Sequence, residues 1–365
     1  MNHKILNSPN PDTNELPTSL PNGAGARLVL LGEQIPLMSM GSREWWPTAV
    51  SDKVRSKLLR RIVNEGLLLP ILLSICISLV SEIYTTTALP ADEEPKRQVT
   101  GKRRVRLTYG QSPISDFGIV KGSTRVVDRD RLAYYNMDDD EFLMGQDPED
   151  HYRIFIKERH GEYYLDLGMF TFNFCMVVQA SPYCVNGLPD LDVVPCFFET
   201  KEIANSAVDT KLFKSQQRFS ILRDERVSGL VRSSEVEYCE CHDQPILHAM
   251  IDEIAGRKCS SWEKEIFLTF LSTSVVIMRS NMQSRAYSKF PKEPSIGIEF
   301  DPGESDLTND EDGEQEAFKN YLTKWGKRLK RGKITADRWD AAFEKWRKMP
   351  HEARIRMGAA KSSEK

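Results

Sequence analysis

The chain has 365 residues, enough for one large domain or two medium ones with a sizeable core. Its 40% hydrophobic and 28% charged residues are typical of soluble globular proteins, and a net charge of −3 excludes a uniformly basic or acidic protein. Seven cysteines in a chain of this length do not form a dense disulfide framework. We therefore expect a reduced, intracellular protein.

The N-terminal 26 residues are rich in Pro, Asn and Ser and lack the apolar core of a secretory signal peptide. A segment of this composition buries little apolar surface, so we expect residues 1–26 to be disordered. Residues 27–38, RLVLLGEQIPLM, are apolar and interrupted by Gly and Pro, which predicts a short strand and a turn. The folded α+β body is expected to span residues 27–300.

The most apolar segment of the chain is residues 66–84, GLLLPILLSICISLVSEIY. Gly favours the end of a helix and Pro is tolerated in a first helical turn, so we predict one helix from about Asp52 to Glu65 and another from about Pro70 to Tyr84. The second helix would be about 22 Å long, shorter than the ~30 Å hydrocarbon core of a bilayer. We interpret residues 52–84 as a helical hairpin whose second helix is buried in the core.

A short membrane anchor at residues 66–84 is the alternative interpretation. Basic residues precede this segment and acidic residues follow it, which is the charge arrangement of a signal anchor with a cytosolic N-terminus. No Asn-x-Ser/Thr acceptor occurs downstream, which argues against passage through a secretory lumen. Contact with a membrane is therefore not the favoured interpretation.

A central antiparallel or mixed sheet is predicted for residues 104–178. Apolar and polar residues alternate over 104–109 and again from 152 to 178, where His160-Gly161 provides a tight turn. The apolar phase changes at Gly168, which predicts a bulge or a second turn. The phenylalanines that follow are interpreted as core residues, with the lining of a ligand cavity as the alternative.

The loops of residues 137–196 are where an enzymatic site would be sought. The acidic stretch 137–151 suits a solvated loop, with a divalent cation site as the alternative, because adjacent acids do not by themselves converge on one ion. No Walker loop, His-Glu-x-x-His or Gly-x-Ser-x-Gly motif occurs in the chain. The sequence therefore assigns no reaction and no catalytic residue.

Over residues 200–290 the apolar residues recur at helical spacing, which predicts helices. One helix is predicted from about Pro245 to Gly256, and Ser260 with Glu263 forms a capping box for a longer one. The longer helix carries an apolar set at helical spacing: Trp262, Ile266, Phe270 and Ile277. A short strand is predicted at residues 295–300, SIGIEF.

A sharp change of charge follows the body. Residues 301–316 contain eight acids and no base, which predicts an exposed acidic linker. Residues 317–365 contain fifteen Lys or Arg and five Asp or Glu, a net charge of +10 that leaves about −13 on residues 1–316. The chain is therefore an acidic body with a basic, separate C-terminal module.

Aromatic residues at helical spacing predict two helices in this module. They are Phe318, Tyr321 and Trp325 in the first, and Trp339, Phe343 and Trp346 in the second. We interpret these aromatics as the core of the module. The basic run between the helices is the candidate surface for a partner protein or nucleic acid: Lys327, Arg328, Lys330, Arg331 and Lys333.

Zinc is the alternative cofactor, although no cofactor is favoured. Five soft ligands occur close together: Cys239, Cys241, His242, His248 and Cys259. Their Cys-x-Cys spacing differs from the usual Cys-x₂-Cys, and the later ligands fall on a predicted helix. Ordinary buried thiols are the favoured interpretation.

The sequence thus predicts an α+β protein with an N-terminal helical hairpin, a central sheet, a helical second half and a small helical C-terminal module. Its expected function is that of a non-catalytic interaction protein, cytoplasmic or nuclear, whose residues 317–365 dock a partner protein or nucleic acid. An enzyme with a site in the 137–196 loops and a protein anchored by residues 66–84 are the alternatives.

Overall fold

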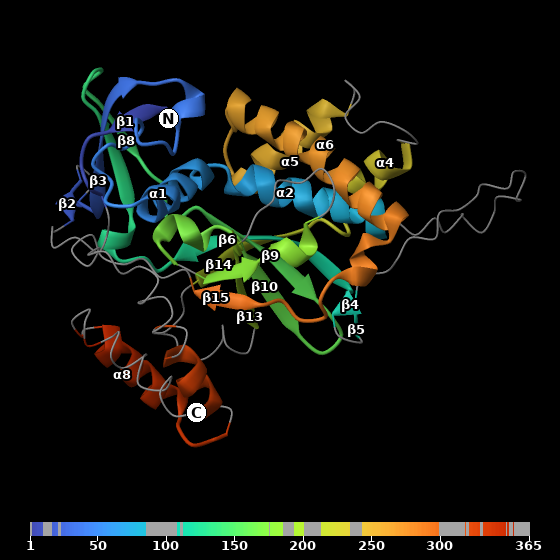
Figure 1. Cartoon of the computed structure of the whole chain (residues 1–365). Coiled ribbons are helices and arrows are strands. Elements are labelled where there is room, and N and C mark those ends of the chain that lie inside the picture. Colours follow the sequence, from blue (N-terminus) through green and yellow to red (C-terminus); the bar gives the residue numbers. More distant parts are fainter. Residues whose placement is uncertain are drawn as a thin grey trace, which may run out of the picture.

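Sheets and helices are combined in a mixed α+β arrangement, with the helices mostly in the second half of the chain (Figure 1). The computed structural model describes residues 2–9, 17–20, 23–84, 108–109, 112–174, 176–184, 193–200, 213–233, 243–298, 318, 321–328, 331–347, 349 and 353. The predicted acidic linker of residues 301–316 lies outside these ranges, as does most of the strand expected at 104–109.

A mixed sheet is built largely from the N-terminal part of the chain. Its strands are β1 (His3–Ile5), β2 (Thr18–Ser19), β3 (Gly25–Gln34), β7 (Leu132–Asn136) and β8 (Glu141–Met144). The order is β1-β3-β7-β8, with β2 also paired to β3. The β3–β7 pair is parallel and the other pairs are antiparallel. The strand predicted within residues 27–38 is confirmed.

The expectation that residues 1–26 are disordered is wrong for two stretches. His3–Ile5 and Thr18–Ser19 each pair with β3, and the Ile5 side chain is 1% exposed. Strand pairing supplies backbone hydrogen bonds that composition alone does not reveal. The polar N-terminus therefore contributes to the fold, and the body begins before residue 27.

An antiparallel sheet forms the centre of the molecule, in the order β13-β10-β9-β6-β14. These strands are β13 (Phe197–Thr200), β10 (Glu162–Asp166), β9 (His151–Lys157), β6 (Asp116–Thr124) and β14 (Phe213–Ser220). The β9–β10 hairpin pairs Lys157 with Glu162 across the turn that contains His160 and Gly161. The predicted tight turn is confirmed.

Strand β14 corrects the prediction that residues 200–290 are helical throughout. Its sequence, FKSQQRFS, has no apolar alternation, and most of its side chains are exposed. It extends because it pairs along β6 from Phe213 with Thr124 to Ser220 with Gly118. An edge strand of this kind is stabilised by backbone pairing rather than by a buried face.

The change of apolar phase at Gly168 comes from a turn, the second of the two predicted possibilities, and not from a bulge. Strand β10 ends at Asp166, and the 3₁₀ helix η4 (Met169–Phe172) starts just after Gly168, so the phenylalanines do not continue a strand. Phe170 and Phe172 are 1% and 5% exposed, which confirms their interpretation as core residues.

Small antiparallel ladders complete the strands. The ladder β12-β11-β15 joins β11 (Met176–Gln179) to β12 (Val193–Pro195) and β15 (Ile296–Ile298), which confirms the predicted strand near residue 296. The strands β4 (Thr108–Tyr109) and β5 (Ser112–Pro113) pair with each other.

The helices have the following bounds: α1 (Asp52–Asn64), α2 (Leu68–Leu79), α4 (Glu225–Ser233), α5 (Gln244–Ala255), α6 (Ser261–Ser284) and α8 (Ala336–Arg347). A π-helical turn, η2 (Val80–Tyr84), continues α2. Short 3₁₀ segments are η1 (Leu37–Ser39), η3 (Asp128–Asp130), η5 (Ser181–Tyr183) and η7 (Ala286–Lys289).

The predicted helix pair is present, but it is bent by 74° rather than folded back on itself as a hairpin. The break falls at Gly66, whose φ of +72° suits glycine. Beyond the break the two helices enter different cores. Helix α1 packs Val54, Leu58 and Ile62 with residues of β3 and β7 and with the buried Trp45-Trp46 pair, whereas α2 packs against the central sheet and α6.

Helix α2 is buried along most of its length and lies between α5, α6 and the central sheet (Figure 1). Ser74 and Ser78 of α2 and Ser81 of η2 are fully buried, and the Ser78 hydroxyl donates to the Ser74 carbonyl at 2.7 Å. This burial favours the interpretation of residues 66–84 as a core segment. In the described part of the chain no single helix is long and apolar enough to cross a membrane; α1 and α2 reach that length and composition only as a bent pair.

Helices α5 and α6 follow the local signals closely. Helix α5 ends at Gly256, which has φ +70°, and Ser260 with Glu263 forms both hydrogen bonds of the predicted capping box. The core face of α6, however, consists of Phe267, Leu271 and Val275. Of the apolar set seen in the sequence, Trp262 and Phe270 are 61% and 39% exposed, and Ile266 and Ile277 are only half-buried.

Candidate functional site

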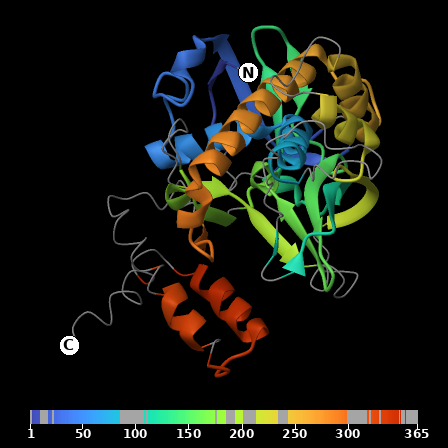
Figure 2. The same ribbon diagram turned by 90° about the vertical axis from the view of Figure 1, so that its right-hand side faces the viewer.

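The C-terminal module is a pair of helices held together by aromatic side chains. Residues 321–328 form a helix that lies beside α8, as the red ribbons of Figure 2 show. The ring of Trp346, which is 1% exposed, lies 5.2 Å from the rings of both Phe318 and Tyr321. Leu322, Trp325 and Phe343 pack around this cluster. The predicted aromatic core of the module is confirmed for five of its six residues, and Trp339 is not part of the cluster.

A tight turn connects the two helices. Gly332 has φ +64°, and backbone hydrogen bonds from Arg331 to Lys327 and from Lys333 to Arg328 close the end of the first helix at 3.3 and 3.0 Å. The Thr335 hydroxyl accepts the backbone N–H of Arg338 at 3.4 Å and caps α8. These local bonds connect the end of the first helix to the described residues of the turn and mark the start of α8.

The structure brings four of the five predicted basic residues together at this turn. Lys327, Arg328, Arg331 and Lys333 are all exposed, while Lys330 lies outside the described residues. Their positive charges are at the C-terminal end of a helix, where the helix dipole stabilises cations. Because Phe318, Tyr321 and Trp346 are buried in the core of the module, the charged side chains exposed at the turn are cations. It is suited to phosphates or carboxylates rather than to base stacking.

A second group of charged residues is buried in the central sheet, within the 137–196 region that was considered for catalysis. His151 Nε2 lies 2.8 Å from Asp166 Oδ2, and Arg153 Nε lies 3.3 Å from the same oxygen. Arg153 Nη2 donates to Glu199 Oε2 at 2.8 Å. The other Asp166 oxygen accepts the backbone N–H groups of Gly168 and Met169, which fixes the start of η4. The sequence did not reveal this group because strand β9 supplies His151 and Arg153, whereas their carboxylate partners come from β10 and β13.

The electrostatics of this group are those of a structural network. Burial acts to raise the pKa of Asp166, but the charge and hydrogen bond of His151 and the charge of Arg153 outweigh it and lower that pKa. Asp166 is thus held ionised beside the guanidinium of Arg153. His151 is 0% exposed and Asp166 2% exposed, so neither reaches solvent in this conformation.

The nearby thiol does not supply an activated nucleophile. Burial, with a smaller effect of the Asp166 charge, raises the pKa of Cys196 to about 11. The thiol is therefore protonated near neutral pH. The enzymatic alternative thus gains no support from these particular residues.

The candidate zinc ligands are only partly within the described residues. Cys239, Cys241 and His242 lie outside them, while His248 is on α5 and Cys259 lies in the connection between α5 and α6. Burial raises the pKa of Cys259 to about 11, and its backbone N–H donates to Asp252 at 2.7 Å. Over the described ranges no three His, Cys, Asp or Glu side chains converge on a metal position.

No family model, curated protein or solved structure matches this chain. Its function is therefore inferred from the contacts, charges and burial of its own residues. Of the groups described above, the basic turn of the C-terminal module combines a defined backbone with exposed charge. It is the candidate binding surface.

Proposed function

We propose that this is a non-catalytic interaction protein, cytoplasmic or nuclear, that docks nucleic acid or a partner protein through its C-terminal module. The observation that supports this function is the grouping of Lys327, Arg328, Arg331 and Lys333 as exposed side chains on one capped turn. The aromatic cluster lies inside the module, and these four basic side chains lie on its surface.

Nucleic acid is the first partner class to test because phosphate contacts give a measurable salt dependence. Each neutralised phosphate contributes a slope of about −0.9 to the plot of log affinity against log salt for duplex DNA. If four basic side chains each contact a phosphate, the slope is about −3.6. The body carries a net negative charge and would not add to this slope.

The test is a fluorescence-anisotropy titration of labelled duplex DNA and single-stranded RNA with the full chain at 50 and 200 mM salt. The first variant replaces Lys327, Arg328, Arg331 and Lys333 with Gln. A matched control makes the same four changes at exposed body residues: Arg129, Arg159, Lys214 and Lys292. We expect the first variant to lose binding and the control, which has the same net charge, to retain it.

The results separate the two partner classes. Binding that falls steeply with salt and is lost only in the first variant supports nucleic acid. If the full chain binds neither polymer, nucleic acid is rejected and acidic protein partners are tested by the same pair of variants. If both variants lose affinity equally for every partner tested, the turn is not the docking surface.

A further inference from the structure

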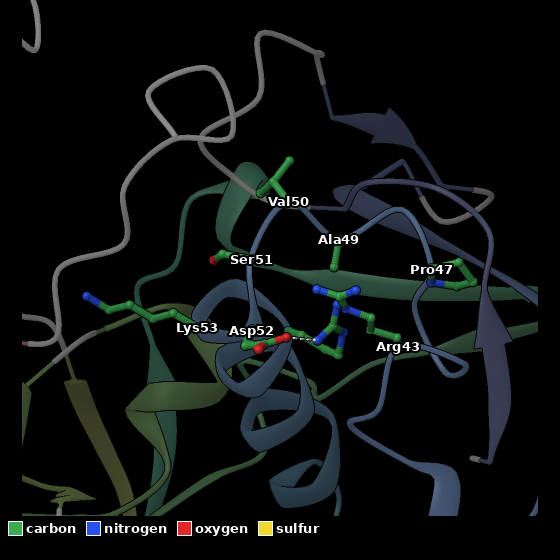
Figure 3. Close-up of a pocket in the computed structure, with 8 residues that line it drawn as sticks. Arg43, Pro47, Ala49, Val50, Ser51, Asp52 and Lys53 are labelled. Atoms are coloured by element: carbon green, nitrogen blue, oxygen red, sulfur yellow. Dashed lines mark hydrogen bonds and ion pairs between the residues drawn. The ribbon is translucent and has the colours of Figure 1, made fainter. Parts of the chain in front are cut away.

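A polar cavity of about 420 Å³ lies at the N-terminal end of α1, outside the C-terminal module (Figure 3). One wall is the loop that precedes α1, including Arg43, Pro47 and Val50, and the other is the first turn of the helix. The volume is within the range of pockets that hold small molecules.

The helix offers hydrogen-bond donors to this cavity. Ser51 is the N-cap, and its hydroxyl accepts the Val54 N–H at 3.1 Å. An α-helix leaves the N–H groups of its first residues without partners in the helix, so those of Asp52 and Lys53 are the donors that remain at this end. The dipole of a 13-residue helix adds partial positive charge at the same place.

Arg55 provides an independent indication of an anion. It lines the cavity, its side chain is 5% exposed, and its Nε–H is buried with no hydrogen-bond partner in the described part of the chain. One Nη of the same guanidinium is paired with Asp52, whose side chain is 84% exposed (Figure 3, dashed line). A buried guanidinium with an unused donor is costly unless an anion accepts from it.

Arg43 contributes a second guanidinium to the cavity. Figure 3 shows its head group directed into the cavity toward Asp52, whereas Lys53 extends away from it. Arg43 and Arg55 thus bring two cations into the cavity beside one carboxylate, that of Asp52. The excess of positive charge, the guanidinium forks and the helix N-terminus together match a phosphate group better than a single carboxylate.

We propose that this cavity binds the phosphate group of a small molecule. The phosphate accepts from Arg55 and Arg43 and from the first N–H groups of α1. The phosphate replaces the Asp52 carboxylate as the partner of Arg55, and the exposed Asp52 side chain turns into solvent. Pro47, Ala49 and Val50 form an apolar edge for the rest of the ligand.

The experiment is isothermal titration of the full chain with inorganic phosphate, at an ionic strength held constant with sodium chloride. Three variants are compared: Arg43→Gln, Asp52→Asn and Arg159→Gln. We expect Arg43→Gln to weaken binding about tenfold or more, because one charge-assisted hydrogen-bonding group is lost. Asp52→Asn should tighten binding because it removes the competing carboxylate, and Arg159→Gln, an exposed arginine of the β9–β10 turn, should leave it unchanged.

The proposal requires opposite changes in phosphate affinity, a decrease for Arg43→Gln and an increase for Asp52→Asn, so one titration series can overturn it. Arg43 and Asp52 are both exposed, so each variant should fold, and its circular dichroism and thermal unfolding are recorded beside the wild type. Absence of phosphate binding by the wild type overturns the proposal. Equal affinity in all variants means an adventitious ion only. Weaker binding in Asp52→Asn also refutes it. Because the cavity is separate from the basic turn, this result does not depend on the nucleic-acid test.

Discussion

Glu65, the residue that caps the C-terminal end of α1, is expected to make the protein less stable as the pH rises from about 5 to about 7. Tyr134 donates its hydroxyl to Glu65 Oε2 at 2.6 Å. Burial raises the pKa of this carboxyl to about 7, and the Tyr134 hydrogen bond and the charge of Arg61 only partly oppose the rise.

The sign follows from the two protonation states. In the unfolded chain the carboxyl ionises near its ordinary pKa of 4.5, whereas in the folded protein it keeps its proton until about pH 7. The folded state therefore binds more protons across this interval, and stability falls as the pH rises. Each pKa unit is worth about 1.4 kcal/mol, so a gap of about 2.5 units sets an upper limit near 3 kcal/mol. Because the Glu65 side chain retains partial exposure, we expect about 1–3 kcal/mol.

The assay is urea unfolding of the wild type and of Glu65→Gln at pH 5 and pH 7.5. Gln does not titrate, and its carbonyl oxygen can still accept from Tyr134. The variant should gain about 1–3 kcal/mol relative to the wild type between the two pH values. The control is Glu141→Gln, an exposed carboxylate on β8 of the same sheet as Tyr134. Identical pH dependence in wild type and Glu65→Gln, or a change of the opposite sign, would refute the reasoning.

Two further substitutions test the buried network and the C-terminal module. Asp166→Asn leaves His151 buried without its carboxylate and Arg153 paired with Glu199 alone, so urea unfolding at pH 7 should show a loss of about 3–5 kcal/mol. The loss should shrink as the pH falls through the lowered pKa of Asp166, because the wild type then protonates too; a loss below about 1 kcal/mol at pH 7 contradicts the assignment. Trp346→Ala removes the centre of the aromatic cluster and should cost the module about 3–5 kcal/mol. Limited proteolysis should then cleave near Tyr321 first while the urea transition of the body is unchanged, and a module that resists protease as before would contradict this.

Local sequence signals predicted the helices well. Gly66, Gly256 and the Ser260–Glu263 capping box mark helix ends within a residue or two of where they lie. Such signals work because a cap is formed by a side chain and backbone groups only a few residues apart. The aromatic core of the C-terminal module was predictable for the same reason, since residues at helical spacing share one face.

Strands without an apolar pattern were not predictable in this way. β1 and β14 are extended because β3 and β6 pair with them, and neither strand contains a signal that identifies its partner. The outward face of α6 was misleading as well. Trp262 belongs to the more conspicuous apolar set, yet the core faces Phe267 and Leu271. Which face of a helix is buried depends on what packs against it.

The sequence by itself determined the α+β class, most helix boundaries and the basic, aromatic C-terminal module, because these depend on composition and on contacts between near neighbours. Only the tertiary structure decided that α1 and α2 diverge into separate cores and that His151 meets Asp166. It also placed Arg43 opposite a buried Arg55 at the start of α1. Those arrangements join residues from separate elements. Their partners are selected by packing and by the need to pair buried charges, neither of which a linear pattern records.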